Sequence, residues 1–190
     1  MPSSVKIVIS GGFGVGKTTF ISAISEIEPL VTEAAMTEVA LGVDDPGHAD
    51  KTQTTVALDF GRITLDSSLI LYLFGTPGQD RFVFLWDDLV DGALGAVIVL
   101  DTGRVEDCYP VLDYFEEHNT PFVVVVNRFE NGAVFELDEV REALELDEWI
   151  PVLECDARQR ESVKDVLVAL LEQVLLHRLS APHLRVRSAG

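Results

Sequence analysis

The stretch GGFGVGKT, residues 11–18, decides the fold expected for this chain. It follows the apolar run VKIVIS, precedes a helical pattern, and satisfies GxxxxGK[ST] with Gly11, Gly16, Lys17 and Thr18. Glycines let the backbone curl around a phosphate, and the N-terminus of the following helix attracts anions. The sequence therefore predicts a phosphate-binding loop between a strand and a helix.

The expected contacts of this loop divide between phosphate and metal. We expect Lys17 to reach the β- and γ-phosphates and Thr18 to offer its hydroxyl to Mg²⁺. Backbone contacts to the nucleotide are expected from Gly12, Gly14, Val15, Gly16 and Thr19. A glycine-rich turn with a chance lysine is the alternative, and the flanking strand and helix argue against it.

Composition and charge limit the classes of function. The chain has 190 residues, 47% of them hydrophobic, and a net charge of -18. This suits one compact domain and disfavours binding to nucleic acid or a bare anionic membrane. We find no signal peptide, membrane span or lipidation motif, and therefore expect a cytoplasmic protein without direct membrane insertion. Cys108 and Cys155 form no CxxC or Cys/His cluster, so reduced thiols are expected.

Short apolar runs alternate with longer amphipathic stretches along the chain. Six runs predict strands: VKIVIS, VALDFGRITL, LILYLF, GAVIVLD, PFVVVVN and IPVLECD. Runs that are apolar at nearly every position are typical of a mainly parallel sheet covered by helices on both faces. The second and third runs should form an antiparallel hairpin around LDSS. The predicted fold is α/β, a mostly parallel six-stranded sheet with one antiparallel strand.

Helical patterns lie between these runs. They cover Thr18–Ile27, Asp80–Val90, Glu106–His118, Glu136–Leu144 and Ser162–Leu179. Residues 30–54 are weakly periodic and interrupted by Gly, Pro and Asp, so we expect a long functional loop there. No linker divides the chain, and we expect one domain over residues 1–179 and a basic tail over 180–190.

Four further motifs follow the phosphate loop. They are TTVALDFG at 54–61, GTPGQDRF at 75–82, NRFE at 127–130 and CDAR at 155–158. With them, the chain from residue 5 to about 179 resembles the Ras-like small GTPases, P-loop NTPases that bind GTP and GDP with Mg²⁺. The wording TTVALDFGRI followed by FGTPGQDRFVFLWDDL looks most like the bacterial conservon-type GTPases, which are distantly similar to the bacterial polarity GTPases. The resemblance implies a roadblock-domain protein partner, a sensor-kinase-like membrane complex, and membrane association through these partners.

The resemblance implies that the motif NRFE recognises the base of the nucleotide. Asn127 matches the asparagine that ties the base motif to the phosphate loop, and Arg128 replaces a lysine whose stem packs on the base. A guanidinium plane can stack there too. Glu130 replaces the aspartate that binds guanine N1 and N2, which favours guanine because a carboxylate offers no donor to adenine N1. A polar loop after a buried strand is the alternative for this motif.

The motif CDAR is expected to complete the base site. The Ala157 N–H matches the group that meets guanine O6, and Arg158 is expected to contact the nucleotide. Asp156 is either a substitute for the family's serine or a turn residue at the end of a strand.

Two segments resemble the switches that sense the γ-phosphate. Thr55, or alternatively Thr54, is expected to bind Mg²⁺ and the γ-phosphate. Gly78 is expected to donate its N–H to the γ-phosphate, and Gln79 to orient the attacking water. Lys17 and Gln79 are the residues expected to carry catalysis.

The second switch departs from the family at Gly75, where an aspartate normally holds a water of the Mg²⁺. Asp59 is a candidate replacement, because its strand should pair with the strand ending at Phe74, and the bacterial polarity GTPases place an acid similarly. A hairpin position facing solvent is the alternative for Asp59. If Asp59 replaces the acid, Asp59→Asn should raise the Mg²⁺ requirement and Gly75→Asp should lower it.

The function expected from these motifs is a regulatory switch. Its GTP hydrolysis should be slow alone and faster with a partner that orders both switches. A scaffold that binds nucleotide without turnover, and a P-loop small-molecule kinase, are the alternatives. A kinase needs a lid rich in arginines, whereas residues 30–54 contain none and residues 82–127 contain only Arg104.

Overall fold

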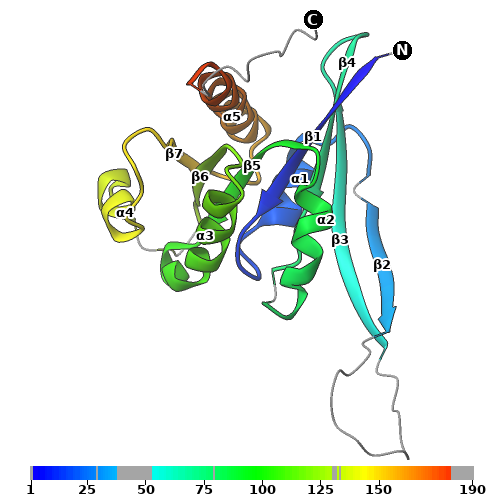
Figure 1. The fold of residues 1–190 in the computed structure, drawn as a ribbon, viewed down its shortest axis with the longest axis horizontal. Coiled ribbons are helices and arrows are strands. Elements are labelled where there is room, and N and C mark those ends of the chain that lie inside the picture. Colours follow the sequence, from blue (N-terminus) through cyan, green and yellow to red (C-terminus); the bar gives the residue numbers. More distant parts are fainter. Residues whose placement is uncertain are drawn as a thin grey trace, which may run out of the picture.

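A seven-stranded sheet forms the centre of the structure, a computed structural model that describes residues 2–28, 30–37, 53–78, 80–129, 132 and 134–180. Its strands lie in the order β2-β3-β4-β1-β5-β6-β7 (Figure 1). They are β1 (Ser3–Ser10), β2 (Leu30–Thr37), β3 (Gln53–Thr64), β4 (Leu69–Gly75), β5 (Ala93–Leu100), β6 (Phe122–Asn127) and β7 (Val152–Cys155). The predicted mostly parallel sheet is confirmed.

Within the described chain, β3 is the one antiparallel strand. It pairs antiparallel with β2 and β4, whereas the pairs from β4 to β7 are parallel. The β3–β4 hairpin turns where predicted, with the Leu65 N–H donating to the Leu69 carbonyl. From β1 the chain runs through α1 to β2 at one edge, and after β4 it crosses to β5 on the other side of β1. The loop after β1 therefore lies at the switch point where such sheets bind ligands.

The strand count exceeds the expected six because β2 lies within residues 30–54, which we expected to be a loop. Leu30–Thr37 pairs with the first part of β3, from Gln53 to Phe60. An edge strand can be stabilised by ladder hydrogen bonds to its neighbour even where its own sequence lacks a strong alternating pattern. Residues 38–52 of the expected loop lie outside the described residues.

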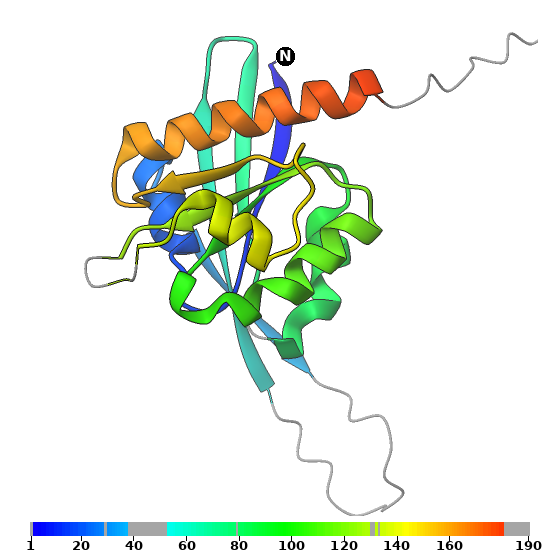
Figure 2. The same ribbon diagram turned by 90° about the vertical axis from the view of Figure 1, so that its left-hand side faces the viewer.

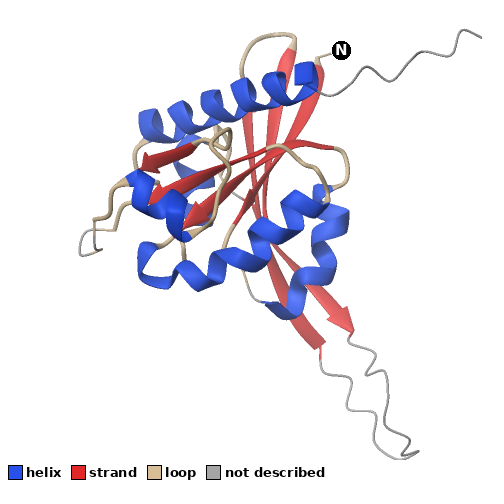
Figure 3. Ribbon diagram, turned by 60° about the vertical axis from the view of Figure 1, so that its left-hand side comes forward, coloured by secondary structure: helices blue, strands red, loops and turns tan. Residues whose placement is uncertain are grey.

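Helices cover both faces of the sheet (Figures 2 and 3). They are α1 (Lys17–Ile24), α2 (Trp86–Val90), α3 (Tyr109–Glu117), α4 (Leu137–Ala143) and α5 (Arg160–Ser180), with 3-10 turns η1 (Asp80–Leu85) and η2 (Thr102–Cys108) before α2 and α3. Phe20 of α1 and Leu170 of α5 lie in one apolar layer, and Trp86 of α2 and Phe115 of α3 in the other. The five predicted helices are thus present.

The central strands supply both layers because successive side chains point to opposite faces. In β1, Ile7 and Ile9 pack with α1 and α5, whereas Val8 packs with α2 and α3. The free thiols of Cys108 and Cys155 are buried in different layers. Among the described helices, none combines the length and apolar character needed to cross a bilayer.

Candidate functional site

The loop between β1 and α1 depends on glycine geometry. Gly11, Gly14 and Gly16 have φ values of 136°, 74° and 106°. A Cβ on Gly11 would lie 2.2 Å from the Val99 carbonyl oxygen, and one on Gly16 would lie 2.4 Å from Asn127 Nδ2. Only glycine meets both the dihedral and the steric requirement, so the loop conformation follows from the motif.

The Lys17 side chain folds back toward the start of this loop. Its Nζ donates to the carbonyls of Gly11 at 2.8 Å and Gly12 at 2.5 Å. The side chain is buried, and this burial lowers the pKa of Lys17 to about 8; nearby Asp59 opposes the shift and Arg104 adds to it. A buried ammonium group among backbone dipoles is an arrangement suited to binding an anion.

Thr18 is hydrogen-bonded to an acid from another strand. Its Oγ1 donates to Asp59 Oδ2 at 2.6 Å. A Cβ on Gly75 would lie 3.0 Å from Asp59 Cβ and 3.2 Å from Asp59 Oδ2. Asp59 therefore faces the loop, not solvent, and fills the space beside Gly75. We revise the expectation that Gly75→Asp alone lowers the Mg²⁺ requirement, because a second carboxylate there would collide with Asp59.

The two switch segments are described in part. A Cβ on Gly78 would lie 2.7 Å from Lys17 Nζ, so the Gly78 backbone lies against the phosphate loop. Thr54 and Thr55 lie in β3 where it pairs with β2, but their side chains are outside the described part of the chain. Gln79 is outside it entirely. The roles expected of these side chains stay predictions.

Asn127, the last residue of β6, connects two loops. Its Nδ2 donates to the Val15 carbonyl at 2.9 Å, and its Oδ1 accepts from the Ala157 N–H at 3.1 Å. The side chain thus makes the connection that the family resemblance implies. The Ala157 N–H, expected at guanine O6, is engaged by Asn127 in this structure.

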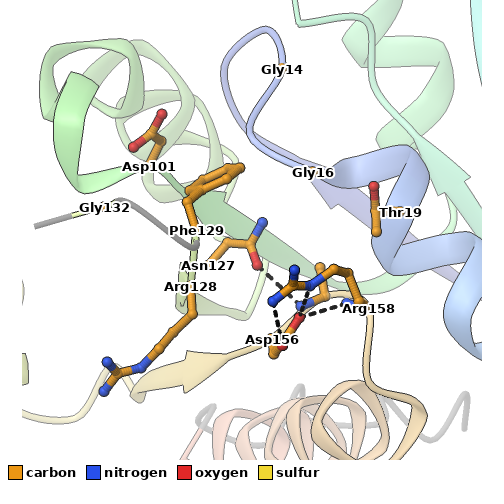
Figure 4. Close-up of a pocket in the computed structure, with 11 residues that line it drawn as sticks. Gly14, Gly16, Thr19, Asp101, Asn127, Arg128, Phe129, Gly132, Asp156 and Arg158 are labelled. Carbon is orange, nitrogen blue, oxygen red and sulfur yellow. Dashed lines mark hydrogen bonds and ion pairs between the residues drawn. The ribbon is translucent and has the colours of Figure 1, made fainter. Parts of the chain in front are cut away.

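A pocket of ≈ 670 Å³ opens beside Asn127 (Figure 4). It is lined by Gly14, Gly16, Thr19, Asp101, Asn127, Arg128, Phe129, Gly132, Asp156, Ala157 and Arg158. The structure therefore brings the phosphate loop, NRFE and CDAR to one cavity. Glu130, the residue expected to select guanine, lies outside the described residues.

The CDAR turn is closed by an ion pair. Arg158 Nε donates to Asp156 Oδ1 and Nη2 donates to Oδ2, both at 2.9 Å. The Arg158 backbone N–H also donates to Oδ1, at 3.0 Å. These hydrogen bonds lower the pKa of the Asp156 carboxyl. Asp156 thus stabilises the turn after β7 and also lines the pocket, and the role expected for it toward the nucleotide stays a prediction.

Arg128 lies elsewhere than the resemblance suggested. Its guanidinium is paired with Glu154 of β7, and Figure 4 shows it pointing away from Asn127 and Arg158. The Arg128 side chain is therefore not in position to stack on a base in the pocket, because its guanidinium is turned toward the Glu154 carboxylate on β7. Phe129, which the sequence analysis missed, lies between Asp101 and Asn127 in this view. An aromatic residue within an otherwise polar loop was the available signal.

A second missed group reaches the phosphate loop from η2. Arg104 Nη2 lies 3.6 Å from the position of a Cβ on Gly14. The guanidinium pairs with Asp101 at 3.4 Å and Asp107 at 3.7 Å. Its backbone is non-helical inside η2, with φ -147° and ψ 58°. The signal in the sequence was a single arginine between residues 82 and 127.

Comparisons with known proteins agree with the P-loop fold. The sequence profile of a family described as conserved hypothetical ATP binding proteins matches residues 9–177, and the chain belongs to this family. An uncharacterised protein of Methanocaldococcus jannaschii is 27% identical over 132 residues, which cover 68% of this chain and 73% of that protein. ADP-ribosylation factor-like protein 3 of Saccharomyces cerevisiae is 24% identical over 93% of this chain and 88% of its own length.

The fold also matches a solved structure. The G domain of the T. maritima FeoB iron transporter superposes with a TM-score of 0.60 at 19% identity. The match covers 93% of this chain and 99% of that domain. These relatives support a P-loop protein of the small-GTPase fold, without singling out the conservon-type group.

Proposed function

We propose that this chain is a guanine-nucleotide-binding switch, which binds GTP and GDP with Mg²⁺ and hydrolyses GTP slowly. The observation that carries the proposal is the Asn127 bridge between Val15 of the phosphate loop and Ala157 of CDAR. A phosphate loop alone suits many nucleotides. A buried side chain that links this loop to the wall of an adjacent pocket fits a ligand with a phosphate end and a base end.

Guanine is the proposed base, although the family description names ATP. The carboxylate of Glu130 could accept hydrogen bonds from guanine N1 and N2, whereas adenine N1 is itself an acceptor. One relative is named an ADP-ribosylation factor-like protein, and the solved neighbour is called a G domain. These names support guanine as the base to test first.

Mg²⁺ is proposed to bind together with the nucleotide, held by Thr18, Thr55 and Asp59. Because the Thr18 hydroxyl donates its hydrogen bond to Asp59, the lone pairs of its oxygen are left for a cation. Mg²⁺ prefers oxygen ligands and keeps several waters, and the Asp59 carboxylate is a suitable acceptor for such a water. Among the described residues, no group of three or more His, Cys, Asp or Glu could hold a metal alone. When bound, the ion would neutralise charge on the phosphates.

Slow hydrolysis fits the distribution of roles around the phosphate loop. Lys17 is proposed to bind the outer phosphates, and the Gly78 backbone lies beside its ammonium group. Gln79 is proposed to orient the attacking water. Positioning supplies most of the catalysis in phosphoryl transfer, so a partner that orders both switches would accelerate the reaction.

The proposed partner is a roadblock-domain protein, with a sensor-kinase-like membrane complex reached through it from the cytoplasm. The resemblance to conservon-type GTPases suggests both. Exposed apolar side chains of the phosphate loop and of η1 offer contact area: Phe13 in the loop is 64% exposed, and Phe84 in η1 is 55% exposed. A contact there would lie next to both the loop and the second switch.

A scaffold that binds nucleotide without turnover is the second candidate, and Gly75 in place of the usual acid favours it. Two measurements separate the candidates. Chromatography identifies the nucleotide that the purified chain retains, and single-turnover assays follow GTP with and without a roadblock-domain partner. We expect retained guanine nucleotide and slow, partner-accelerated hydrolysis. Binding without turnover in either condition would establish the scaffold, and retained adenine nucleotide would refute the choice of base.

A further inference from the structure

We infer that the Phe129 ring, and not Arg128, forms the flat surface on which the nucleotide base stacks, across the pocket from the Arg158 guanidinium. The inference rests on the proposed function and assigns a residue to its base site. It comes from three features of the pocket: the direction of Arg128, the placement of Phe129, and the fixed plane of Arg158.

Arg128 is committed to the neighbouring strand. Its guanidinium is hydrogen-bonded and ion-paired to the Glu154 carboxylate, and this contact raises the pKa of Arg128 further. The guanidinium of Arg128 is therefore held as a cation against this carboxylate. Figure 4 shows the side chain directed away from the other residues that line the pocket. Stacking on a base would require breaking the pair and reversing the side chain.

The Phe129 side chain, unlike that of Arg128, is in position to contact a base in the pocket. It lines the pocket, and its side chain is 41% exposed. Asn127, two residues earlier, is fixed by its two hydrogen bonds, and the Gly132 N–H donates to the Phe129 carbonyl at 3.1 Å. The ring is therefore carried by a residue anchored through Asn127 before it and through its own carbonyl. An aromatic ring with this exposure would gain burial and stacking energy from a planar ligand.

The opposite wall is also planar. Two hydrogen bonds of 2.9 Å to Asp156 hold the Arg158 guanidinium, which lies across the pocket from Phe129 in Figure 4. Aromatic rings and guanidinium planes both stack on bases, and stacking tolerates any base because every base has a π-face. Phe129 should thus add affinity for purine nucleotides in general, while the choice between purines is left to the groups at the base edge.

The test compares Phe129→Ala with Phe135→Ala in the full chain. Phe135 is a matched control, because it is 43% exposed, follows Phe129 in the same connection between β6 and α4, and does not line this pocket. Calorimetric titrations use GDP with Mg²⁺, and inorganic tripolyphosphate as a probe without a base. Phe129→Ala should weaken GDP binding roughly 5- to 150-fold, the range for removing a base-stacking aromatic, with tripolyphosphate affinity kept. Phe135→Ala should leave both affinities within roughly two-fold, and Arg128→Ala should weaken GDP binding less than Phe129→Ala does.

Unchanged GDP affinity in Phe129→Ala, or an equal loss for tripolyphosphate, would overturn the inference and leave the proposed function standing. Failure of the unmodified chain to bind GDP would overturn the proposed function together with the inference. Phe129→Trp gives an independent readout. Its added fluorescence, relative to the unmodified chain, should be quenched by GDP and not by tripolyphosphate. Absence of quenching by bound GDP would overturn the stacking.

Discussion

The two ends of the candidate nucleotide site are built in different ways. At the phosphate end, Lys17 is buried against backbone carbonyls, and Thr18 is tied to Asp59 across to β3. Gly75 and Gly78 pack so closely on these side chains that a Cβ on either would collide or nearly collide. Lys17 and Gly75 at this end are buried, so changes there should affect folding or every phosphate ligand.

At the base end, charged pairs lie at the surface. Arg128 pairs with Glu154 and Asp156 with Arg158, and these side chains are 26% to 50% exposed. Of the polar side chains that line the described pocket, Asn127 is the one buried at 8% exposure, and it joins the two ends. Substitutions at the base end should therefore alter binding of the base with little effect on folding.

The largest effect is expected for Lys17→Ala at the phosphate end. It removes the buried ammonium group, and loss of one partner of a desolvated charge pair typically weakens binding about 100-fold or more. GDP and tripolyphosphate should lose affinity equally in calorimetric titrations, because the lysine is proposed to contact phosphate and not the base. Lys164→Ala on the exposed face of α5 is the control and should bind normally. Undiminished binding by Lys17→Ala would refute the assignment of the phosphate loop.

Gly75→Asp should destabilise the fold. The new carboxylate would meet Asp59 in a packed site, and overpacking of this kind costs about 1–3 kcal/mol of unfolding free energy. The double variant Gly75→Asp with Asp59→Gly should regain the lost stability, because the site then again holds a single carboxylate. Urea unfolding measures the free energy of unfolding of each variant. If the single variant is as stable as the unmodified chain, Asp59 does not fill the space beside Gly75.

Asp59→Asn should raise the Mg²⁺ concentration needed for GTP binding about 10- to 100-fold, the usual effect of losing an outer-shell partner of a metal site. The amide keeps the size of the side chain and removes its charge. Asp113→Asn on the exposed face of α3 controls for the loss of one negative charge. An unchanged magnesium dependence in titrations of GTP binding would remove Asp59 from the proposed metal site.

Arg128→Ala should have the smallest effect of the set. The pair with Glu154 is half exposed, and exposed ion pairs contribute little to stability because water screens both charges. The midpoint of thermal unfolding should match that of the unmodified chain. A marked fall in the midpoint would show that the base end contributes to folding as the phosphate end does.

The phosphate end was largely predictable from the sequence, because its motif fixes backbone shape. GGFGVGKT requires glycine at positions of positive φ, and the alternating apolar runs predicted the sheet around it. Asp59 could be proposed because hairpin pairing constrains which residues meet. β2 was missed because an edge strand depends on its neighbour more than on its own pattern.

The base end was less predictable, because an exposed side chain can pair with any of several residues that are distant in the sequence and become neighbours only in the fold. Arg128 could face the base or β7, and only the three-dimensional position of Glu154 shows which it does. Phe129 was missed for a related reason: it could be recognised as a pocket residue only once the Arg128 side chain was seen to point away from the pocket. The position of Arg104 likewise depends on the non-helical backbone inside η2.

The most direct test of the account is a competition between GTP and ATP for the unmodified chain in the presence of Mg²⁺, repeated with Glu130→Lys. We predict that the unmodified chain prefers GTP, because the Glu130 carboxylate is proposed to accept hydrogen bonds from guanine, whereas adenine N1 offers it no donor. Glu130→Lys should lose this preference while keeping its affinity for tripolyphosphate, since the phosphate end is untouched. Equal affinity of the unmodified chain for GTP and ATP, or a preference for ATP, would contradict the claim of a guanine-nucleotide switch.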